Sequence, residues 1–450
     1  MPGLRRARVA ALVAAIGALF VAVLGVSLAA VGERPTPTDP VPPDAAAPAA
    51  TASAPPAAPA PPPTTSSPPA PPRTGTAQSL WLHLNSTATT DDLLATEARR
   101  RSFVVLNQWE SGLIPRLKAA NPAIRVYVYK DLSSTRSYAC RNGVDDRDLP
   151  TGVGYCDADA NHPDWFLTSP RGGRYEYSGY PGHWQMDVGN PDYQNAWAAN
   201  VIAAATAAGF DGVEMDNALF DCDTYHRGSC PPKYPDDRAM QAAYTSMLQN
   251  VRDDFRAAGL ETVANLANAR LHPGVWDAYT EHLDGGFDEW WLVFSDTNML
   301  AEYGEGWSRV VGQIESNEVR GKITWVQPHF SPGAVRPFRY AFASYLMAAG
   351  PRSAFVEIAR TDAYGDPTPW RPEYEWDLGD PAGPRTPVGP NLWRRDFACG
   401  VAVVNAGASR SGARTVELGG PFVDQDGATV TSVSLAGTSG AVLRRPGCAP

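Results

Sequence analysis

Two segments of the chain place acidic side chains directly after short apolar runs. The first is FDGVEMDN at 210–217 and the second is GFDEWW at 286–291. Apolar neighbours raise the pKa of a carboxyl group held beside them, which suits proton transfer near neutral pH. Cleavage of a glycosidic bond requires two carboxyl groups, one to donate a proton and one to attack or to activate water. The two segments therefore predict this chemistry, with Asp216 and Glu289 as the catalytic pair.

Each of these acids also has a structural interpretation. Asp216 could cap the following loop, and Glu289 could pair with a buried arginine. The neighbouring Asp288 is a rival acid; strand alternation puts Asp288 and Glu289 on opposite faces, so only one can point into a shared site. Glu214 shares the face of Asp216 one layer deeper, and we favour a supporting role for it over a catalytic one.

Polar and aromatic side chains at other strand ends and in one long loop are the candidates for substrate binding. Amide and carboxylate groups hydrogen-bond to hydroxyls, and aromatic rings offer apolar faces. The candidates are Lys130, Asp131, Trp184, Asp187, Asn217, Asn265, Asn268, Trp290, Gln327, His329 and Glu357. The alternative for each is structural, since an Asn at a strand end often only satisfies the backbone and a lone His more often packs in the core.

No cofactor or metal ion is expected. The stretch DADAN at 157–161 begins like a calcium loop, but His162 stands where the EF-hand pattern requires Gly. Asp221 and Asp223 are a second weak candidate for an ion. The chain contains no GxxxxGK[ST], GxSxG, HExxH or GxGxxG, which argues against nucleotide, serine-hydrolase, zinc-protease and dinucleotide chemistry. Its net charge of -10 argues against a nucleic-acid partner.

The elements that must position these residues alternate between strand and helix. Eight apolar, strand-like runs lie at 79–85, 103–109, 124–130, 211–217, 261–268, 285–292, 322–329 and 353–358. Helical patterns lie at 91–101, 112–120, 191–208, 237–258, 273–283, 299–316 and 336–349. Short runs buried on both faces are typical of parallel strands. The order predicts an α/β fold, a (β/α)8 TIM barrel whose site lies at the C-terminal strand ends.

The barrel is expected to span residues 78–385. Its long third connection, 131–190, should wall the cleft, and HWQMD at 183–187 predicts a short extra strand there. Residues 386–450 show alternating strands separated by Gly and Ser, which predicts a small antiparallel β-sandwich. We expect this domain to pack on the barrel, with carbohydrate binding as the alternative.

The N-terminal part has the composition of a targeting segment and a stalk. In residues 1–34 three arginines precede an apolar run, 9–32, that only Ser27 interrupts. Secretory apolar regions span about 7–15 residues and membrane spans about 20, so the run favours an uncleaved anchor, with a cleaved signal as the alternative. Residues 35–77 are rich in Pro and Ala and should form an extended stalk. The protein is thus expected at the cell surface or outside the cell.

Six cysteines in an exported chain suggest disulfides, and six allow 15 pairings. Loop closure favours neighbours in sequence. The expected pairs are Cys140 with Cys156, Cys222 with Cys230, and Cys399 with Cys448.

The segment FDGVEMDN, preceded by MDVGNPDYQNAWAANV at 186–201, resembles the strand-four region of the bacterial hypothetical glycosyl hydrolase family 15. More distantly, residues 78–358 are similar to dextranase-like enzymes and endo-α-1,4-polygalactosaminidases. In dextranase-like enzymes an Asp ending strand four is the nucleophile and a Glu on strand six is the acid/base. The resemblance therefore implies these roles for Asp216 and Glu289.

Together the motifs and the resemblance predict an exported glycoside hydrolase that acts on a polysaccharide or oligosaccharide by a retaining, two-carboxylate mechanism. We expect a carbohydrate substrate, a monomer, and membrane contact through the N-terminal segment only. The alternatives are a non-catalytic carbohydrate-binding surface protein on the same scaffold, and a transglycosidase that uses the same covalent intermediate.

Overall fold

The computed structural model describes residues 75–84, 89–358, 364, 367 and 369–448. The predictions made for 1–34 and for nearly all of 35–77 lie outside the described residues. None of the helices in the described part of the chain combines the length and apolar composition that a membrane crossing requires.

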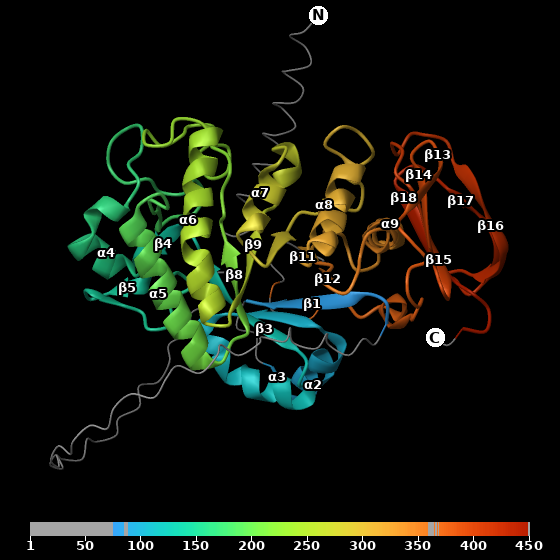
Figure 1. Ribbon diagram of the computed structural model, residues 1–450, viewed down its shortest axis with the longest axis horizontal. Helices are drawn as coiled ribbons and strands as arrows, with labels where there is room; N and C mark the ends of the chain where they lie inside the picture. The colour runs from blue at the N-terminus through green and yellow to red at the C-terminus, as the bar shows by residue number, and fades with distance from the viewer. Residues whose placement is uncertain (1–74, 85–88, 359–363, 365–366, 368, 449–450) are drawn as a thin grey trace, which may run out of the picture.

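Eight parallel strands close into a barrel, as the sequence predicts (Figure 1). They are β1 (Gln78–His83), β2 (Phe103–Leu106), β3 (Arg125–Asp131), β8 (Gly212–Asp216), β9 (Glu261–Asn265), β10 (Gly285–Asp288), β11 (Ile323–Val326) and β12 (Ser353–Phe355). Each strand pairs in parallel with the strands before and after it in this order, and β1 closes the barrel on β12. The predicted α/β barrel is therefore confirmed.

The inside of the barrel is filled by side chains that alternate along the strands. Tyr127 of β3 and Trp325 of β11 meet edge to face, with ring centroids 4.9 Å apart, and Phe287 of β10 packs beside them. Gly212 of β8 makes room for this layer, since a Cβ atom there would lie 2.4 Å from the ring of Tyr127. Large aromatic side chains thus form a packed floor beneath the strand ends.

Seven helices connect the strands in the predicted order: α2 (Asp91–Arg100), α3 (Ile114–Ala120), α5 (Pro191–Ala208), α6 (Asp237–Ala257), α7 (Val275–Glu281), α8 (Trp307–Val319) and α9 (Val335–Leu346). Local sequence fixes the ends of α5, where the Asn190 side chain caps the first turn and Gly209 ends the helix at a φ of 80°. Helix α8 begins eight residues later than predicted, because Met299 instead pairs with Val293 in the loop after β10.

The long connection between β3 and β8 carries its own small elements. They are β4 (Ser134–Arg136), β5 (Cys140–Arg141), β6 (Val144–Asp145), α4 (Tyr155–Asn161) and β7 (His183–Gln185). The predicted extra strand at 183–187 is confirmed as β7, which pairs antiparallel with β4. The stretch 157–161, which begins like a calcium loop, lies in α4.

The C-terminal part forms the predicted antiparallel β domain. Its strands are β13 (Thr386–Gly389), β14 (Leu392–Phe397), β15 (Gly400–Asn405), β16 (Arg414–Val423), β17 (Thr429–Leu435) and β18 (Ser439–Arg444), bonded in the order β13-β14-β15-β18-β16-β17. One face encloses a core of its own that joins Val401 and Val403 of β15 to Val416 and Phe422 of β16. Leu392 of β14 and Leu435 of β17 belong to the same core, so one six-stranded antiparallel sheet encloses it.

The other face of this sheet packs on helix α9 (Figure 1). Ala402 and Val404 of β15 belong to the same buried cluster as Phe342 of α9. Gly440 of β18 lies so close that a Cβ atom would be 2.7 Å from the Cβ of Ala343. The β domain therefore packs on the barrel, as predicted, with the backbone of β18 directly against helix α9.

The three predicted disulfides all form: Cys140–Cys156, Cys222–Cys230 and Cys399–Cys448. No free cysteine remains in the described chain. Three disulfides fit an extracellular protein, because such bonds persist in oxidising compartments.

Candidate active site

The two predicted catalytic acids lie at the C-terminal ends of barrel strands. Asp216 is the last residue of β8, and Glu289 directly follows β10. Glu289 shares its face with Phe287, which packs inside the barrel, so Glu289 points into the mouth. Asp288 turns the other way and accepts a hydrogen bond from the Trp290 backbone. The rival acid is thus outside the mouth.

Asn265, the last residue of β9, links the two acids. Its Nδ2 lies 3.1 Å from Oδ1 of Asp216 and 2.7 Å from Oε2 of Glu289. The two oxygens cannot be further apart than these lengths together, about 5.8 Å. The strand order explains this position, since β9 lies between β8 and β10 in the barrel.

Further hydrogen-bond donors reach each acid. Asp216 accepts the hydroxyl of Tyr129 at 2.6 Å on Oδ2 and the backbone N–H of Asn217 at 2.9 Å on Oδ1. With Asn265, three donors converge on this carboxylate, an environment suited to an anion. On Glu289, Oε1 contacts the hydroxyl of Tyr364.

Burial and neighbouring charges raise the pKa values of Glu289 and Glu214. Burial first, and the charge of Asp216 second, raise the pKa of Glu289 to about 7. Burial, followed by the charges of Asp216, Glu289 and Asp131, raises the pKa of Glu214 well above its usual range. Glu214 lies on the inward face of β8 beneath Asp216, as predicted. At neutral pH the protonated form of Glu214 is therefore favoured, and Glu289 is close to half protonated.

Asp131 and Asn217 form a second layer beside the pair. Asn217 donates its Nδ2 to Asp131 at 2.9 Å, while its Oδ1 accepts the Tyr225 hydroxyl at 2.7 Å. Burial raises the pKa of Asp131 to about 6, opposed by the guanidinium of Arg136, 3.6 Å away. Both predicted residues are thus at the site, where their polar atoms already have protein partners.

Three further candidates gather beside Glu289. The Nε2 of His329 lies 2.7 Å from the Glu289 carbonyl oxygen and 3.1 Å from Nε2 of Gln327. Trp290 stacks on the His329 ring, with centroids 3.8 Å apart. Burial lowers the pKa of His329 to about 4, so the imidazole is neutral at pH 7. These residues support the backbone that carries Glu289.

Other predicted residues are not brought into the mouth. Lys130 lies on the opposite face of β3 from Tyr129 and bonds to the Leu149 carbonyl. Trp184 turns towards Tyr155 of α4, with ring centroids 6.4 Å apart. These positions do not fit the substrate-binding role predicted for Lys130 and Trp184.

The structure also places three other candidates elsewhere. Asp187 pairs with Lys233 and Tyr234 in the loops between β3 and α6. Glu357 follows β12 on the outer face and pairs with Arg371 at 2.7 Å. Asn268 has a φ of 66° and begins a short turn after β9, where its backbone N–H bonds to Asp288. Ion pairing and turn formation account for these residues.

Sequence reasoning missed the tyrosines that surround the acids. Tyr129 and Tyr364 contact Asp216 and Glu289 directly. Tyr180, in the loop before β7, feels the charge of Glu289, and Tyr225 stacks on Tyr177 with centroids 4.3 Å apart. Strand alternation could have revealed Tyr129, two residues before Asp131. The loop tyrosines carry no such signal.

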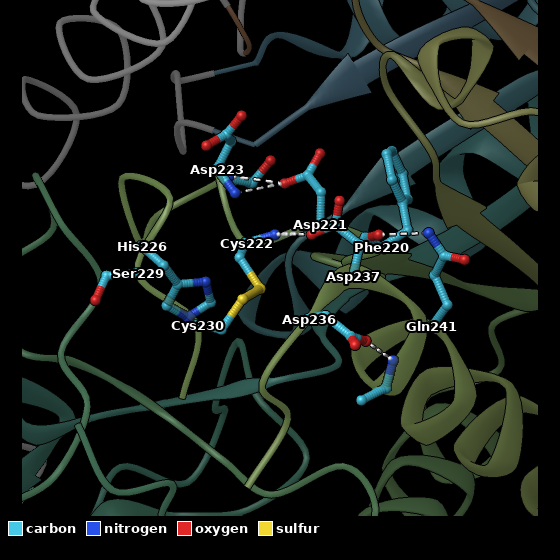
Figure 2. Close-up of a disulfide and its surroundings, with 12 residues drawn as sticks. Phe220, Asp221, Cys222, Asp223, His226, Ser229, Cys230, Asp236, Asp237 and Gln241 are labelled. Atoms are coloured by element: carbon cyan, nitrogen blue, oxygen red, sulfur yellow. Dashed lines mark hydrogen bonds between the residues drawn. A yellow bond between two sulfur atoms is a disulfide. The ribbon is translucent and has the colours of Figure 1, made fainter. Parts of the chain in front are cut away.

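The loop that follows Asp216 is braced by the Cys222–Cys230 disulfide (Figure 2). Asp237, at the start of α6, accepts the Cys222 backbone N–H at 2.9 Å, and Gln241 donates to the Phe220 carbonyl at 2.8 Å. The loop is therefore fastened to α6 on one side and presents Tyr225 to the site on the other.

The described residues contain two groups of side chains close enough to hold a metal ion. Both are built on disulfide cysteines, Cys140 with Cys156 and Cys222 with Cys230, whose sulfurs are bonded to each other. Asp221 instead pairs with His272 at 3.2 Å and accepts the backbone N–H of Thr224. These contacts give Asp221 protein partners and account for its position without a metal ion.

Three of the solved structures that match this fold are described by their similarity to the chain. The glycoside hydrolase domain of PelA from Pseudomonas aeruginosa matches with a TM-score of 0.40 and 14% identity, covering 64% of this chain and 98% of its own. Ega3 of Aspergillus fumigatus, in complex with galactosamine, matches with a TM-score of 0.38 and 12% identity, over 66% and 94% of the two chains. An alpha-amylase from Malbranchea cinnamomea gives 0.45 and 11%, over 84% and 92%.

These similarities are too low to transfer a substrate or a site residue. Among curated proteins, none matches the chain at a significant level. A family model does match: residues 118–401, well over half of the chain, fit the hypothetical glycosyl hydrolase family 15. This span includes both acids, Asn265, and every barrel strand from β8 to β12. The chain therefore belongs to the hypothetical glycosyl hydrolase family 15.

Proposed function

We propose that the protein hydrolyses glycosidic bonds of a polysaccharide or oligosaccharide, with Asp216 as nucleophile and Glu289 as general acid and base. The observation that carries this proposal is the shared contact of both carboxyl groups with Asn265, which keeps their facing oxygens within about 5.8 Å. Retaining glycosidases hold their two carboxyl groups about 5–5.5 Å apart, and inverting enzymes about 6.5–9.5 Å. The short separation supports retention.

The surroundings of each acid support its role. Three donors converge on Asp216, which suits a carboxylate that attacks the anomeric carbon. Glu289 has a pKa of about 7, so a large share is protonated at neutral pH and can protonate the leaving oxygen. After the glycosyl–Asp216 ester forms, ionised Glu289 removes a proton from water, which then attacks the anomeric carbon and releases Asp216.

The first test is release of reducing sugar from a panel of α- and β-linked polysaccharides by the full chain. Asp216→Asn and Glu289→Gln should each lower kcat/KM at least about a thousandfold while the melting temperature stays near that of the wild type. Asp253→Asn, an exposed change on α6, is the matched control and should keep full activity. An active Asp216→Asn protein would refute the assignment.

Product analysis then tests the stereochemistry. The first-formed sugar should keep the anomeric configuration of the substrate, observed by proton NMR before mutarotation. Inversion would exclude Asp216 as a nucleophile. Products longer than the substrate would instead indicate transfer to a sugar acceptor, and glycan binding without any turnover by the wild type would favour a carbohydrate-binding surface protein.

We further propose that the enzyme acts outside the cytoplasm, held at the membrane by residues 9–32 or released after cleavage there. The apolar composition of that run and the three disulfides support export. Cell fractionation with mass spectrometry of the mature N-terminus distinguishes the two forms. Recovery in the cytoplasm with reduced cysteines would refute export.

A further inference from the structure

Asn265 occupies the one strand end that lies between the two acids. In the register of the barrel, Met215 pairs with Ala264 and Phe287 pairs with Asn265. The side chain of Asn265 is therefore level with Asp216 on one side and just below Glu289 on the other. Its hydrogen bonds to both carboxyl groups follow from this position.

The orientation of the amide is fixed by the chain itself. Oδ1 of Asn265 accepts the backbone N–H of Ala267 at 3.2 Å, so Nδ2 is turned towards the acids. An amide nitrogen carries two hydrogens. One can point at Oδ1 of Asp216 and the other at Oε2 of Glu289 without competition. Reversing the amide would bring its oxygen against two carboxyl groups and leave the Ala267 N–H without this acceptor.

This arrangement determines where Glu289 carries its proton. Oε2 receives a hydrogen from Asn265, and an amide nitrogen cannot accept one in return. Oε1 accepts the hydroxyl of Tyr364, which can turn to accept instead, so a proton on Glu289 belongs on Oε1. The same contact with Asn265 limits how far Glu289 can move from Asp216. Both the distance between the acids and the protonated oxygen thus depend on one side chain.

We propose that Asn265 is the positioning residue of the acid pair: its amide sets the separation of Asp216 and Glu289 and confines the acidic proton to Oε1 of Glu289. This role replaces the substrate contact that the sequence suggests for Asn265, and it rests on the proposed function for its catalytic meaning. Loss of the amide removes a donor to the charged form of Glu289, so proton binding by Glu289 becomes tighter.

Several titratable groups face Glu289 and must be held constant in a test. They are Asp216 and Glu214 from β8, Asp288 beside it, Tyr364 after β12, and Tyr180 and Tyr225 from the loops. The neutral imidazole of His329 contacts the Glu289 backbone carbonyl and Gln327. A substitution at position 265 leaves all of these side chains in place, and it also removes one hydrogen-bond donor from Asp216.

The test follows the Glu289 carboxyl group in the full chain by 13C NMR of protein labelled at glutamate Cδ. The Glu289→Gln variant assigns the signal. In Asn265→Ala the titration should move to higher pH, with proton binding about tenfold tighter than in the wild type. The control, Asn250→Ala, removes an exposed amide from α6 and should leave the signal where it is. A folded Asn265→Ala protein with an unchanged titration would overturn the proposal.

A second variant keeps the experiment decisive if Asn265→Ala does not fold. Asn265→Asp has the same shape and can still accept the Ala267 N–H, but it offers no amide hydrogens. Its charge should move the Glu289 titration upward further than Asn265→Ala does. A downward shift, or none, would contradict the positioning role.

Turnover adds a readout that separates this proposal from the hydrolase assignment. With an active substrate, Asn265→Ala should lower kcat more than it changes KM, and its alkaline limb should move to higher pH. The NMR titration requires no substrate, so a shifted signal in a protein without hydrolase activity would uphold the positioning role and refute the function. An active enzyme whose Glu289 signal is not shifted in Asn265→Ala would uphold the function and refute the positioning role.

Discussion

Glu214 lies beneath the proposed catalytic pair and is 3% exposed. Burial and three neighbouring acids keep this carboxyl group protonated at neutral pH. A protonated carboxyl and an amide have nearly the same shape and neither carries charge. We therefore interpret Glu214 as a neutral spacer under Asp216, in line with the supporting role that the sequence suggests.

This interpretation predicts that Glu214→Gln keeps most of the hydrolase activity. The substitution should also change the pH dependence of stability. The folded protein holds a proton on Glu214 that the unfolded chain releases above pH about 4.3, so this residue destabilises the wild type increasingly as the pH rises. The free energy of unfolding of Glu214→Gln, relative to the wild type, should therefore increase from pH 4 to pH 7 in denaturant titrations. A relative decrease would mean that Glu214 is ionised in the fold.

Glu289 predicts the pH dependence of turnover. Its pKa of about 7, raised by burial and then by Asp216, makes the protonated acid disappear as the pH rises through neutrality. The kcat/KM of the wild type should fall tenfold per pH unit above about pH 7. The profile is measured with an activated aryl glycoside of the substrate sugar and with the natural glycan. The fall in kcat/KM at alkaline pH should be largest for the substrate with the poorer leaving group. If that substrate shows no such fall, Glu289 is excluded as the acid.

At the scale of elements, most of the fold follows from the sequence. Each barrel strand is an apolar run between a helix and a loop, so strand order and helix order were both predictable. The strand ends were not. The predicted strand 322–329, for example, extends past Val326, where β11 ends. Gln327 and His329 bond instead to the end of β10, to the loop after it and to each other. The periodicity of apolar residues in the sequence indicates which residues are buried. The hydrogen-bonded ladder of a strand, in contrast, ends where neighbouring strands diverge, which the sequence pattern does not show.

The candidate site was only partly predictable for the same reason. Asp216, Glu289 and Asn265 end consecutive strands, so topology alone brings them together. Tyr364 lies beyond β12 in a segment without periodicity, and its contact with Glu289 depends on the path of that segment. Lys130 and Glu357 have the right chemistry but the wrong strand face. Deciding which face of a strand a side chain occupies requires the register of that strand. The sequence does not determine the register to within one residue, and a shift of one residue moves every side chain to the other face.

The disulfides lead to a prediction about two separate elements. Cys222–Cys230 spans 8 residues beside the site, whereas Cys399–Cys448 spans 49 residues in the β domain. Loop-closure entropy gives about 2.5 kcal/mol for the short bridge and about 4 kcal/mol for the long one. Replacing the pair at 399 and 448 by serine should therefore cost more stability in thermal melts. Replacing the pair at 222 and 230 should cost more activity, because that loop presents Tyr225 to Asn217.

At the scale of the whole molecule, polar and apolar contacts join the barrel to the β domain. Arg336 of α9 donates hydrogen bonds to the Gly437 and Thr438 carbonyls, and Arg395 of β14 donates to the Leu346 and Ala349 carbonyls at the end of α9. Polar bonds therefore surround the apolar contact between α9 and the sheet. We expect one cooperative unfolding transition for both parts.

Gly440 tests this coupling. A Cβ atom there would lie 2.8 Å from the backbone oxygen of Arg339 in α9, which cannot move without shifting the helix. Gly440→Val should destabilise the whole protein by about 1–3 kcal/mol. Gly412→Val is the matched control in the same domain, since nothing lies within 4 Å of a Cβ atom at that position. Two separate transitions in calorimetry of Gly440→Val would show that the β domain unfolds independently.

The described chain enters the barrel on the face opposite the candidate site. Thr76 bonds to Trp376 and Leu378 just before β1 begins at Gln78. The start of a parallel strand lies at the floor of the barrel, while Asp216 and Glu289 stand at the opposite rim. Residue 75 is therefore on the face of the barrel opposite the candidate site, so a partner or support attached to the chain at that point would leave the mouth accessible to a substrate.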